Sequence, residues 1–345
     1  MMKERSIFFP RTAIIVLVGA LMGTTSASVS PQELPQVTVN VFPGGFNWPS
    51  FVAQDKGFFE RNRIRVTLQF TPNSVAQMTG LAEGKFDIAI TAVDNIVAYV
   101  EGQGEAPIGP QPEFFAFMGS DSGFLSLVVT PDIKSFYDLK GKTLSVDART
   151  TGYAFVLFEM LARNGLNEGE YSIERVGGTA QRWNALRDKK QSGTLLSTPF
   201  NLIAQQQHFI ELAKATTVIG PYQGNVAATR RSWARQNENL VIAFVRGYVQ
   251  AIDWLYDKTN REEAVRILEK NVPEMSPGLA QQSYEELLDA QHGFSRKGRI
   301  NFEGLRTVLA LRSHYAQPPK TLADTLKYYD PSYYDSAVGE QRPNR

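Results

Sequence analysis

Short polar or glycine-bearing turns follow the apolar runs of this sequence. Hydroxyl and carboxamide side chains at such turns can cap a helix, and they can also hold a small molecule. The turns that we single out carry Phe46, Asn47, Trp48, Asn73, Ser74, Thr91, Asp94, Thr150, Thr151, Gly178 and Thr198. Capping explains any one polar turn but does not require aromatic residues beside it. The set therefore predicts a pocket with aromatic walls, and core packing is the alternative for Trp48.

Residues 87–95 indicate how these turns are brought together. The apolar run at 88–93 does not alternate, which is typical of a strand buried on both faces. Asp94 or Asn95 is expected to cap the helix that follows. Open α/β sheets bind ligands where a parallel strand ends at a helix N-terminus. If Asp94 faces the pocket, it opposes an anion and favours an amine or a ring N–H.

Arginine and lysine are scarce at the turns, and Arg149 and Arg182 lie nearest. An anionic ligand would therefore depend chiefly on backbone N–H groups, hydroxyls and helix dipoles.

Signatures of catalysis and metal binding are missing or broken. The glycine-rich stretch at 80–85 is one residue short of a phosphate-binding loop and ends a predicted helix. In residues 119–123, Asp121 stands where a nucleophile elbow needs serine. None of the three histidines, His208, His292 and His314, has the i, i+4 spacing of a helical zinc pair. We predict no catalytic residue, metal ligand or cofactor.

Composition and the N-terminus indicate the compartment. With 36 basic and 35 acidic residues among 345, the chain has no strong field to attract nucleic acid. Residues 1–27 read as a signal peptide, because Lys3 and Arg5 precede an apolar run at 12–22 that is too short for the roughly 20 residues of a membrane span. The chain has no cysteine, which excludes disulfides and a lipid-modified cysteine. We expect a free periplasmic protein.

Two series of strands and helices organise the chain. The first predicted strands, which we expect to form a parallel sheet, are 37–42, 64–70, 87–93 and 114–118. The second series is 125–130, 143–147, 172–176 and 194–197, with 215–219 as a further strand. Glycine-rich breaks at 119–123 and 220–224 are candidate hinges, and 225–230 is a strand returning to the first sheet. Predicted helices follow at 240–256, 261–270, 277–290 and 302–313. The fold class is α/β with two lobes: 36–119 plus 222–345 form lobe 1 and 120–221 form lobe 2.

Three motifs resemble a known family. Residues 47–59 (NWPSFVAQDKGFF), 84–90 (GKFDIAI) and 138–143 (DLKGKT) are similar to motifs of the SsuA/THI5-like (NMT1-type) solute-binding proteins. The resemblance covers about 37–260. It implies a type II periplasmic-binding fold with a ligand cleft between two α/β lobes and two hinge crossings. It also implies that the ligand contacts Asn47, Trp48, Asn73, Ser74, Thr91, Thr150, Thr151 and Thr198.

Members of that family serve ABC importers for nitrate, sulfonates, taurine and thiamine-pyrimidine precursors. We therefore expect a monomeric receptor, not an enzyme, that binds a sulfonate-, taurine- or pyrimidine-like solute. It would deliver this solute to a membrane permease and its ATPase. The alternatives are a secreted enzyme on the same fold, with Asp94 as the best candidate group, and a ligand sensor for a membrane receptor.

Overall fold

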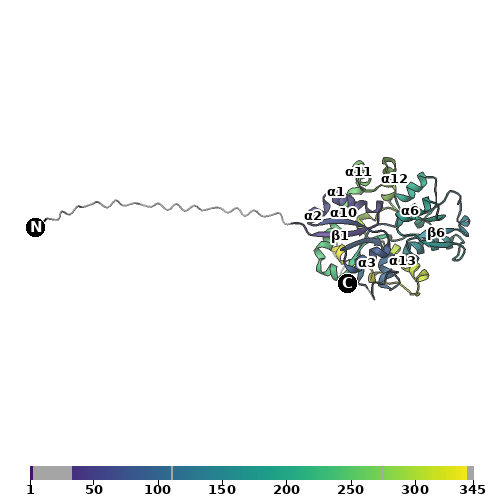
Figure 1. The fold of residues 1–345 in the computed structure, drawn as a ribbon, viewed down its shortest axis with the longest axis horizontal. Helices are drawn as coiled ribbons and strands as arrows, with labels where there is room; N and C mark the ends of the chain where they lie inside the picture. The colour runs from purple at the N-terminus through teal and green to yellow at the C-terminus, as the bar shows by residue number, and fades with distance from the viewer. Residues whose placement is uncertain (3–32, 110–111, 274, 340–345) are drawn as a thin grey trace. The chain divides into compact units, whose positions relative to one another are not determined.

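The computed structural model describes residues 1–2, 33–109, 112–273 and 275–339, so nearly all of the predicted signal peptide at 1–27 lies outside the described residues. The first sheet has the order β2-β1-β3-β10-β4. Its strands are β1 (Gln36–Val41), β2 (Arg65–Phe70), β3 (Ile88–Ala92), β4 (Phe114–Gly119) and β10 (Asn225–Arg230). The helices between the first four are η1 (Gly45–Asn47), α1 (Trp48–Asp55), α2 (Phe58–Arg61), α3 (Ser74–Glu83) and α4 (Val93–Val100). In Figure 1 the chain from β1 to β4 is coloured purple to blue, whereas β10 falls in the green range of the colour bar.

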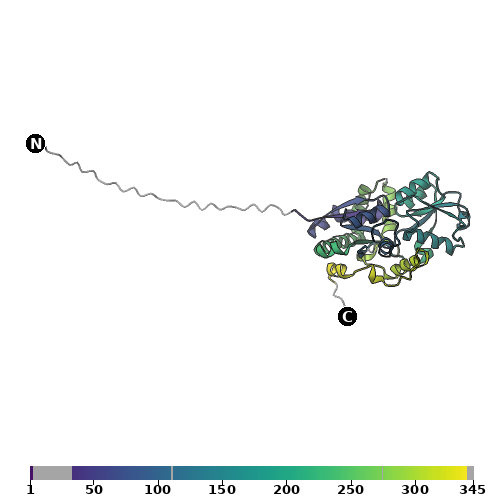
Figure 2. The same cartoon turned by 60° about the horizontal axis from the view of Figure 1, so that its bottom comes forward.

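The second sheet repeats the same plan, with the order β7-β6-β8-β5-β9. Its strands are β5 (Ser126–Val129), β6 (Thr143–Val146), β7 (Ser172–Arg175), β8 (Gly193–Leu196) and β9 (Ile210–Lys214). Its helices are η2 (Phe136–Leu139), α5 (Gly152–Arg163), α6 (Thr179–Arg187), α7 (Phe200–Gln206) and α8 (Ala215–Ile219). Figure 2 shows the two sheets as separate layers, each with its own helices. The predicted α/β fold with two lobes is confirmed.

The four predicted strands of the first sheet run in the same direction, but the sheet is mixed, because β10 lies antiparallel between β3 and β4. One detail of the prediction is wrong. Residues 215–219 form helix α8, and the edge strand is the preceding segment, β9. The β-branched residues of 215–219 favour a strand, but the β5–β9 pairing ends at Ser126 opposite Lys214, and Ala215 makes one more backbone bond, to the Leu125 carbonyl at 2.8 Å. The chain then turns into a helix.

The chain crosses between the sheets twice, and the two crossings pack on each other. Asp121, in the first crossing, is buried and accepts hydrogen bonds from the backbone and side chain of Asn225 in the second. Gly224 donates its N–H to the Asp121 carbonyl at 2.8 Å. A Cβ on Gly224 would lie 2.0 Å from the backbone nitrogen of Gly123, so only glycine allows this approach. The predicted boundaries of the two lobes remain a proposal.

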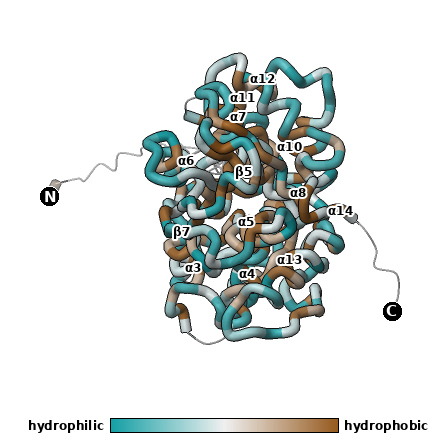
Figure 3. The backbone as a smooth tube through the Cα atoms, turned by 90° about the vertical axis from the view of Figure 1, so that its right-hand side faces the viewer, coloured by the Kyte–Doolittle hydropathy of each residue, from teal (hydrophilic) through white to brown (hydrophobic). Residues whose placement is uncertain are grey.

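Helices after β10 cover the first sheet and reach the second. They are α9 (Arg231–Gln236), α10 (Glu238–Tyr256), η3 (Lys258–Asn260), α11 (Arg261–Asn271), α12 (Pro277–Leu287), η4 (Arg296–Gly298), α13 (Phe302–Tyr315), η5 (Thr325–Lys327) and α14 (Ser332–Val338). Helix α10 packs against α1, α2 and α14, and α13 contacts both α4 and α5. Figure 3 shows apolar stretches gathered in the interior and polar stretches in the outer loops. Among the described residues, no helix has both the length and the apolar character needed to cross a bilayer.

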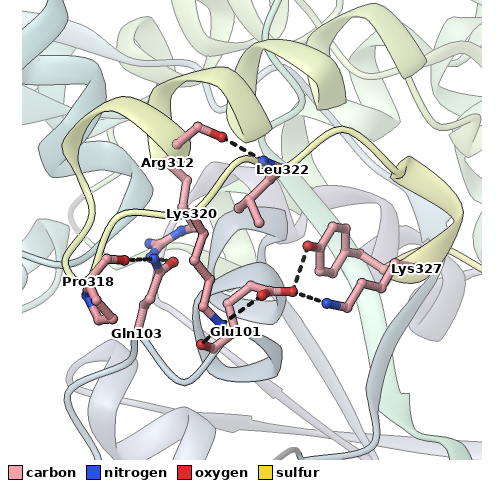
Figure 4. A network of polar contacts seen from close by, with 9 residues as sticks. Glu101, Gln103, Arg312, Pro318, Lys320, Leu322 and Lys327 are labelled. Atoms are coloured by element: carbon pink, nitrogen blue, oxygen red, sulfur yellow. Dashed lines mark hydrogen bonds and ion pairs between the residues drawn. The ribbon is translucent and has the colours of Figure 1, made fainter.

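The segment after α13 returns to the end of α4, where Glu101 holds it. The Glu101 carboxylate accepts hydrogen bonds from Lys320 (3.0 Å), Tyr328 (2.8 Å) and Lys327. Figure 4 shows this cluster beside Gln103, which donates to the Pro318 carbonyl at 2.7 Å. Burial alone would raise the pKa of Glu101, but these bonds outweigh it and lower the pKa to about 2.

We expect Glu101→Gln to lower the free energy of unfolding at pH 7 by about 2–3 kcal/mol. A carboxylate with a depressed pKa stabilises the fold above its ordinary pKa and loses that contribution as the pH falls through the folded value. The difference between the two proteins should therefore shrink from about pH 4.5 toward pH 2. Urea unfolding across this range measures it, with exposed Glu238→Gln as the control. A difference that does not change with pH would contradict this account.

Candidate functional site

A cavity with about 530 Å³ of empty space lies between the two sheets. Both lobes line it through the ends of their strands and the turns that follow. The lining residues are Phe42, Phe46, Ala92, Asn95, Gly123, Asp147, Thr151, Gly152, Tyr153, Gly178, Thr179, Arg182, Ser197 and Asn225. The lobes also touch beside it: Gly178 donates its N–H to the Pro72 carbonyl at 3.0 Å, and Ser74 donates its N–H to Asp147 at 3.0 Å. The two lobes therefore contact each other directly beside the cavity.

Three helices begin at the cavity wall. Helix α4 begins after Ala92, α5 after Thr151 and α6 after Gly178, and all three of these residues line the cavity. The first N–H groups of a helix have no acceptor within the helix, and its dipole gives that end a partial positive charge. Together the three helix ends favour a negatively charged group in the cavity.

Arg182, in the first turns of α6, adds a full positive charge to the same wall. It is only 4% exposed, and its guanidinium donates to neutral oxygens. These are Thr194 Oγ1 (3.1 Å), Thr179 Oγ1 (3.2 Å), and the carbonyls of Gly177 (2.7 Å) and Leu195 (3.0 Å). Burial lowers the pKa of Arg182, but arginine stays charged at physiological pH. In the described chain no carboxylate lies within 4.0 Å of it. The nearest balancing charge that acts on it is Asp147, which also lines the cavity.

Tyr153 contributes a free hydroxyl. Its oxygen is buried and has no hydrogen-bond partner among the described residues. Burial, and then the charge of Asp121, raise the pKa of Tyr153 far above its ordinary value. The phenol therefore stays neutral and can donate a hydrogen bond to a ligand. The Tyr153 hydroxyl at the cavity wall is thus a donor without an acceptor in the described part of the chain.

Asp94 does not cap α4, and that prediction is wrong. The helix begins directly after β3 with no side-chain cap, and Asn95 donates instead to Thr91 Oγ1 at 2.8 Å. The Asp94 carboxylate is 1% exposed and forms a two-pronged ion pair with Arg312 of α13, which is itself wholly buried. Arg312 also donates to the Thr150 carbonyl of the other lobe at 2.6 Å. Because Arg312 balances the charge of Asp94, this carboxylate gives no reason to expect that the cavity disfavours an anion.

Comparison with known proteins assigns the chain to a family. A sequence model described as "NMT1/THI5 like" matches residues 47–262, which is well over half of the chain. The chain belongs to the NMT1/THI5-like family. The predicted resemblance to this family is thereby confirmed. A sequence relative is the "Putative binding protein YtlA" of Bacillus subtilis (strain 168), which is 24% identical over 301 residues, covering 84% of this chain and 87% of that protein.

Solved structures share the fold of this NMT1/THI5-like chain. The periplasmic nitrate-binding protein NrtA from Synechocystis PCC 6803 has a TM-score of 0.72 and 13% identity, with 90% of each chain covered. The alkanesulfonate-binding protein SsuA from Xanthomonas axonopodis pv. citri, bound to MOPS, has a TM-score of 0.68 and 14% identity, covering 87% of this chain and all of that one. The desulfurization enzyme DSZB has a TM-score of 0.59 at 13% identity, covering 89% of this chain and all of that one. At these identities the likeness shows the fold.

Some of the predicted ligand residues of the NMT1/THI5-like chain line the cavity, and others have structural contacts. Phe46, Thr151 and Gly178 line it. The others do not line it. Asn47, Asn73 and Thr91 make local hydrogen bonds: Asn47 donates to the carbonyls of Phe42 and Gly44, Asn73 caps α3, and Thr91 accepts from Asn95. Ser74, Thr150 and Thr198 contact the opposite lobe through backbone atoms, and Trp48 lies in the core. At several of these positions the side chain caps a helix or makes a hydrogen bond within its own turn, which is the alternative that we gave for any single turn.

Trp48 follows the core alternative. Its side chain is wholly buried, its indole N–H donates to the Ala264 carbonyl at 3.0 Å, and its ring meets Tyr284 edge-on with centroids 5.7 Å apart. Its apolar size and its position before Pro49 suit a core residue at a helix start as well as they suit a ligand wall.

We expect Trp48→Phe to lower the free energy of unfolding by about 1–3 kcal/mol and to leave ligand affinity unchanged. The smaller ring leaves a gap and removes one buried hydrogen bond. Chemical denaturation gives the first quantity and calorimetric titration the second. A weakened affinity without loss of stability would place the indole at the ligand after all.

Sequence reasoning missed Phe42, Asp147 and Arg182 as cavity residues. Phe42 and Asp147 directly follow β1 and β6, so the rule that ligands bind after strands could have included them. Arg182 lies one turn inside a helix and carries no such signal. In the part of the chain that the structure describes, no His, Cys, Asp and Glu side chains gather in a group of three that could hold a metal ion.

Proposed function

We propose that this protein is the periplasmic solute-binding component of an ABC importer and that it binds a small organic anion of the sulfonate or taurine type. The observation that carries the proposal is the cavity between the lobes, which is lined by Arg182, three helix N-termini and Tyr153 with its unpartnered hydroxyl. Buried donors of this kind stabilise an anion and cost little reorganisation. The carboxylate of Asp147, on the same wall, could accept a hydrogen bond from an amino group such as that of taurine.

Family membership and the named relatives support the transport role. YtlA is named as a binding protein, and NrtA and SsuA as nitrate- and alkanesulfonate-binding proteins. A ligand that contacts both lobes stabilises the closed form, which would then deliver the solute to the permease and its ATPase. The predicted signal peptide is in keeping with a periplasmic location, and we propose that the protein acts there as a monomer.

We further propose that the cavity binds its solute without turnover, although DSZB is named as an enzyme on this fold. The titratable groups that line the cavity are Asp147, Tyr153 and Arg182. A phenol with a strongly raised pKa and an arginine are poor proton acceptors near neutral pH. Mass spectrometry of a candidate solute after incubation would reveal conversion and would contradict this part of the proposal.

Thermal unfolding with a panel of solutes tests the proposal. The panel contains taurine, MOPS, nitrate, a hydroxymethylpyrimidine and simple amines. A sulfonate present at a hundred times its Kd should stabilise the protein by about 2.7 kcal/mol. Stabilisation by the pyrimidine or the amines alone would overturn the assignment of an anion, and no shift with any solute would count against a receptor of this class.

A further inference from the structure

A second cavity between the lobes shares no residue with the first and has about 790 Å³ of empty space. Ser126 at the start of β5 and Lys214 at the end of β9 line one side. Glu286 of α12, with Asp289 and His292 just after that helix, lines the other. Residues of the first crossing between the sheets lie beside them. A molecule bound here would touch both lobes next to the crossings.

Opposite charges face this cavity without pairing. In the described chain neither Lys214 nor Glu286 has an ion-pair partner within 4.0 Å. The Glu286 carboxylate accepts hydrogen bonds from the Asn201 side-chain amide at 2.9 and 3.2 Å. Burial raises the pKa of Glu286, although Lys214 acts in the opposite direction through space. The half-buried Glu286 carboxylate thus has the Asn201 amide as a hydrogen-bond partner but no contact with a cation of the described chain.

The hydroxyl of Ser126 is the second observation that points to a ligand. Ser126 is 1% exposed, and its Oγ has no hydrogen-bond partner among the described residues. Ser126 and Lys214 are directly opposite in the β5–β9 pairing, so their side chains leave the same face of the sheet. An unused donor therefore lies beside the unpaired ammonium, and this pair suits a carboxylate group.

The other charged groups at the cavity are already engaged. Glu285 pairs with Arg261 at 2.5 Å. Asp289 accepts backbone N–H groups of Gln291 and His292, at 2.9 and 2.7 Å. The His292 ring shares a hydrogen bond with the Thr216 hydroxyl at 3.1 Å. Among the described residues the Lys214 ammonium thus has no ion pair at the sheet, and it faces the carboxylates of Glu286 in α12 and Asp289 just after it.

We propose that this second cavity binds a small zwitterion of the α-amino acid class, with its carboxylate at Lys214 and Ser126 and its ammonium at Glu286. A ligand with both charges satisfies both walls, whereas a simple anion or cation satisfies one and is repelled by the other. Because the two walls belong to different lobes, such a ligand stabilises the closed arrangement. It should therefore also raise the affinity of the first cavity for its solute.

Calorimetric titration with each of the common α-amino acids tests the proposal, using the full mature chain and the Arg182→Met variant in parallel. The best binder is compared with its amide and with its N-acetyl form, each of which lacks one charge. We expect Lys214→Met and Glu286→Gln each to weaken binding at least tenfold. The exposed Lys134→Met serves as the matched control and should bind as the unmodified protein does. Thermal unfolding shows that each variant is folded.

Three outcomes would overturn the proposal. The first is that no amino acid binds, and the second is that the amide and N-acetyl forms bind equally well. The third is that binding is lost in Arg182→Met and kept in Lys214→Met and Glu286→Gln, which places the amino acid in the first cavity. Failure of the sulfonate assay leaves these measurements readable, since they do not require a ligand in the first cavity.

Discussion

Replacement of Arg182 by methionine is expected to weaken binding of a sulfonate at least 100-fold, equivalent to about 2.7 kcal/mol. Among the described residues that line the cavity, the change removes the only full positive charge, at a side chain whose 4% exposure gives little screening by water. It also removes the donors that hold the carbonyls of Gly177 and Leu195 at the cavity wall. Calorimetric titration with taurine or MOPS measures the loss.

Two further variants separate charge from position. Arg182→Lys keeps the charge but cannot reach four acceptors with one planar group, so an intermediate loss is expected. Arg187→Met removes a charge from the same helix at an exposed position beside Asp188 and should leave the affinity unchanged. If the folded Arg182→Met protein binds the sulfonate as tightly as the unmodified protein, the ligand does not depend on this cavity wall.

The second large effect is expected on stability, when the buried ion pair of Asp94 and Arg312 is broken. Arg312→Met leaves the Asp94 carboxylate buried without its cation, and we expect a loss of about 3–5 kcal/mol in the free energy of unfolding. Arg312 also bonds to Thr150 and Gln103, at 2.6 and 3.3 Å, so contacts across the lobes and to the C-terminal segment weaken together. Urea denaturation measures the change.

The double variant Asp94→Leu with Arg312→Met tests whether the loss arises from the unpaired charge. It should recover much of the stability, since replacing both partners by apolar residues leaves no buried charge. If it is as unstable as Arg312→Met alone, packing and not charge is the cause. The outcome separates the ion pair from the other contacts of the Arg312 side chain.

Gly152→Ala tests closure without altering any charge. A Cβ on Gly152 would lie 2.4 Å from the Cβ of Asp94, across the contact between the lobes. Alanine is acceptable in the first turn of α5 itself, so each lobe should still fold. We expect at least tenfold weaker binding and a larger radius of gyration in X-ray scattering. Gly278→Ala, which meets no atom within 4 Å, is the matched control, and equal behaviour of both variants would contradict the closed arrangement.

Most of the fold could be predicted from local sequence patterns. Strand β10 was predicted with its observed bounds, because hydrophobic runs between breaks are a property of neighbouring residues. The turns with Phe46, Thr151 and Gly178 were also recognised, since residues that follow strands are read from the chain in order. The prediction of a strand at 215–219 was wrong, because the tertiary environment overrides strand propensity in this segment, which forms α8.

The sequence by itself determined the two series of strands, the turns that follow them and the family. Tertiary structure alone decided which turn residues meet the cavity and which serve as caps or core. Asp94 and Arg312 are 218 positions apart, and no local period indicates that they form a pair. Arg182 and Trp48 likewise have ordinary helical neighbours, and only packing sends one to the cavity and the other to the core. Hydrophobic periodicity and helix capping depend on residues that are close in the sequence. Charge pairing and burial depend on which distant segments the folded chain places next to a residue.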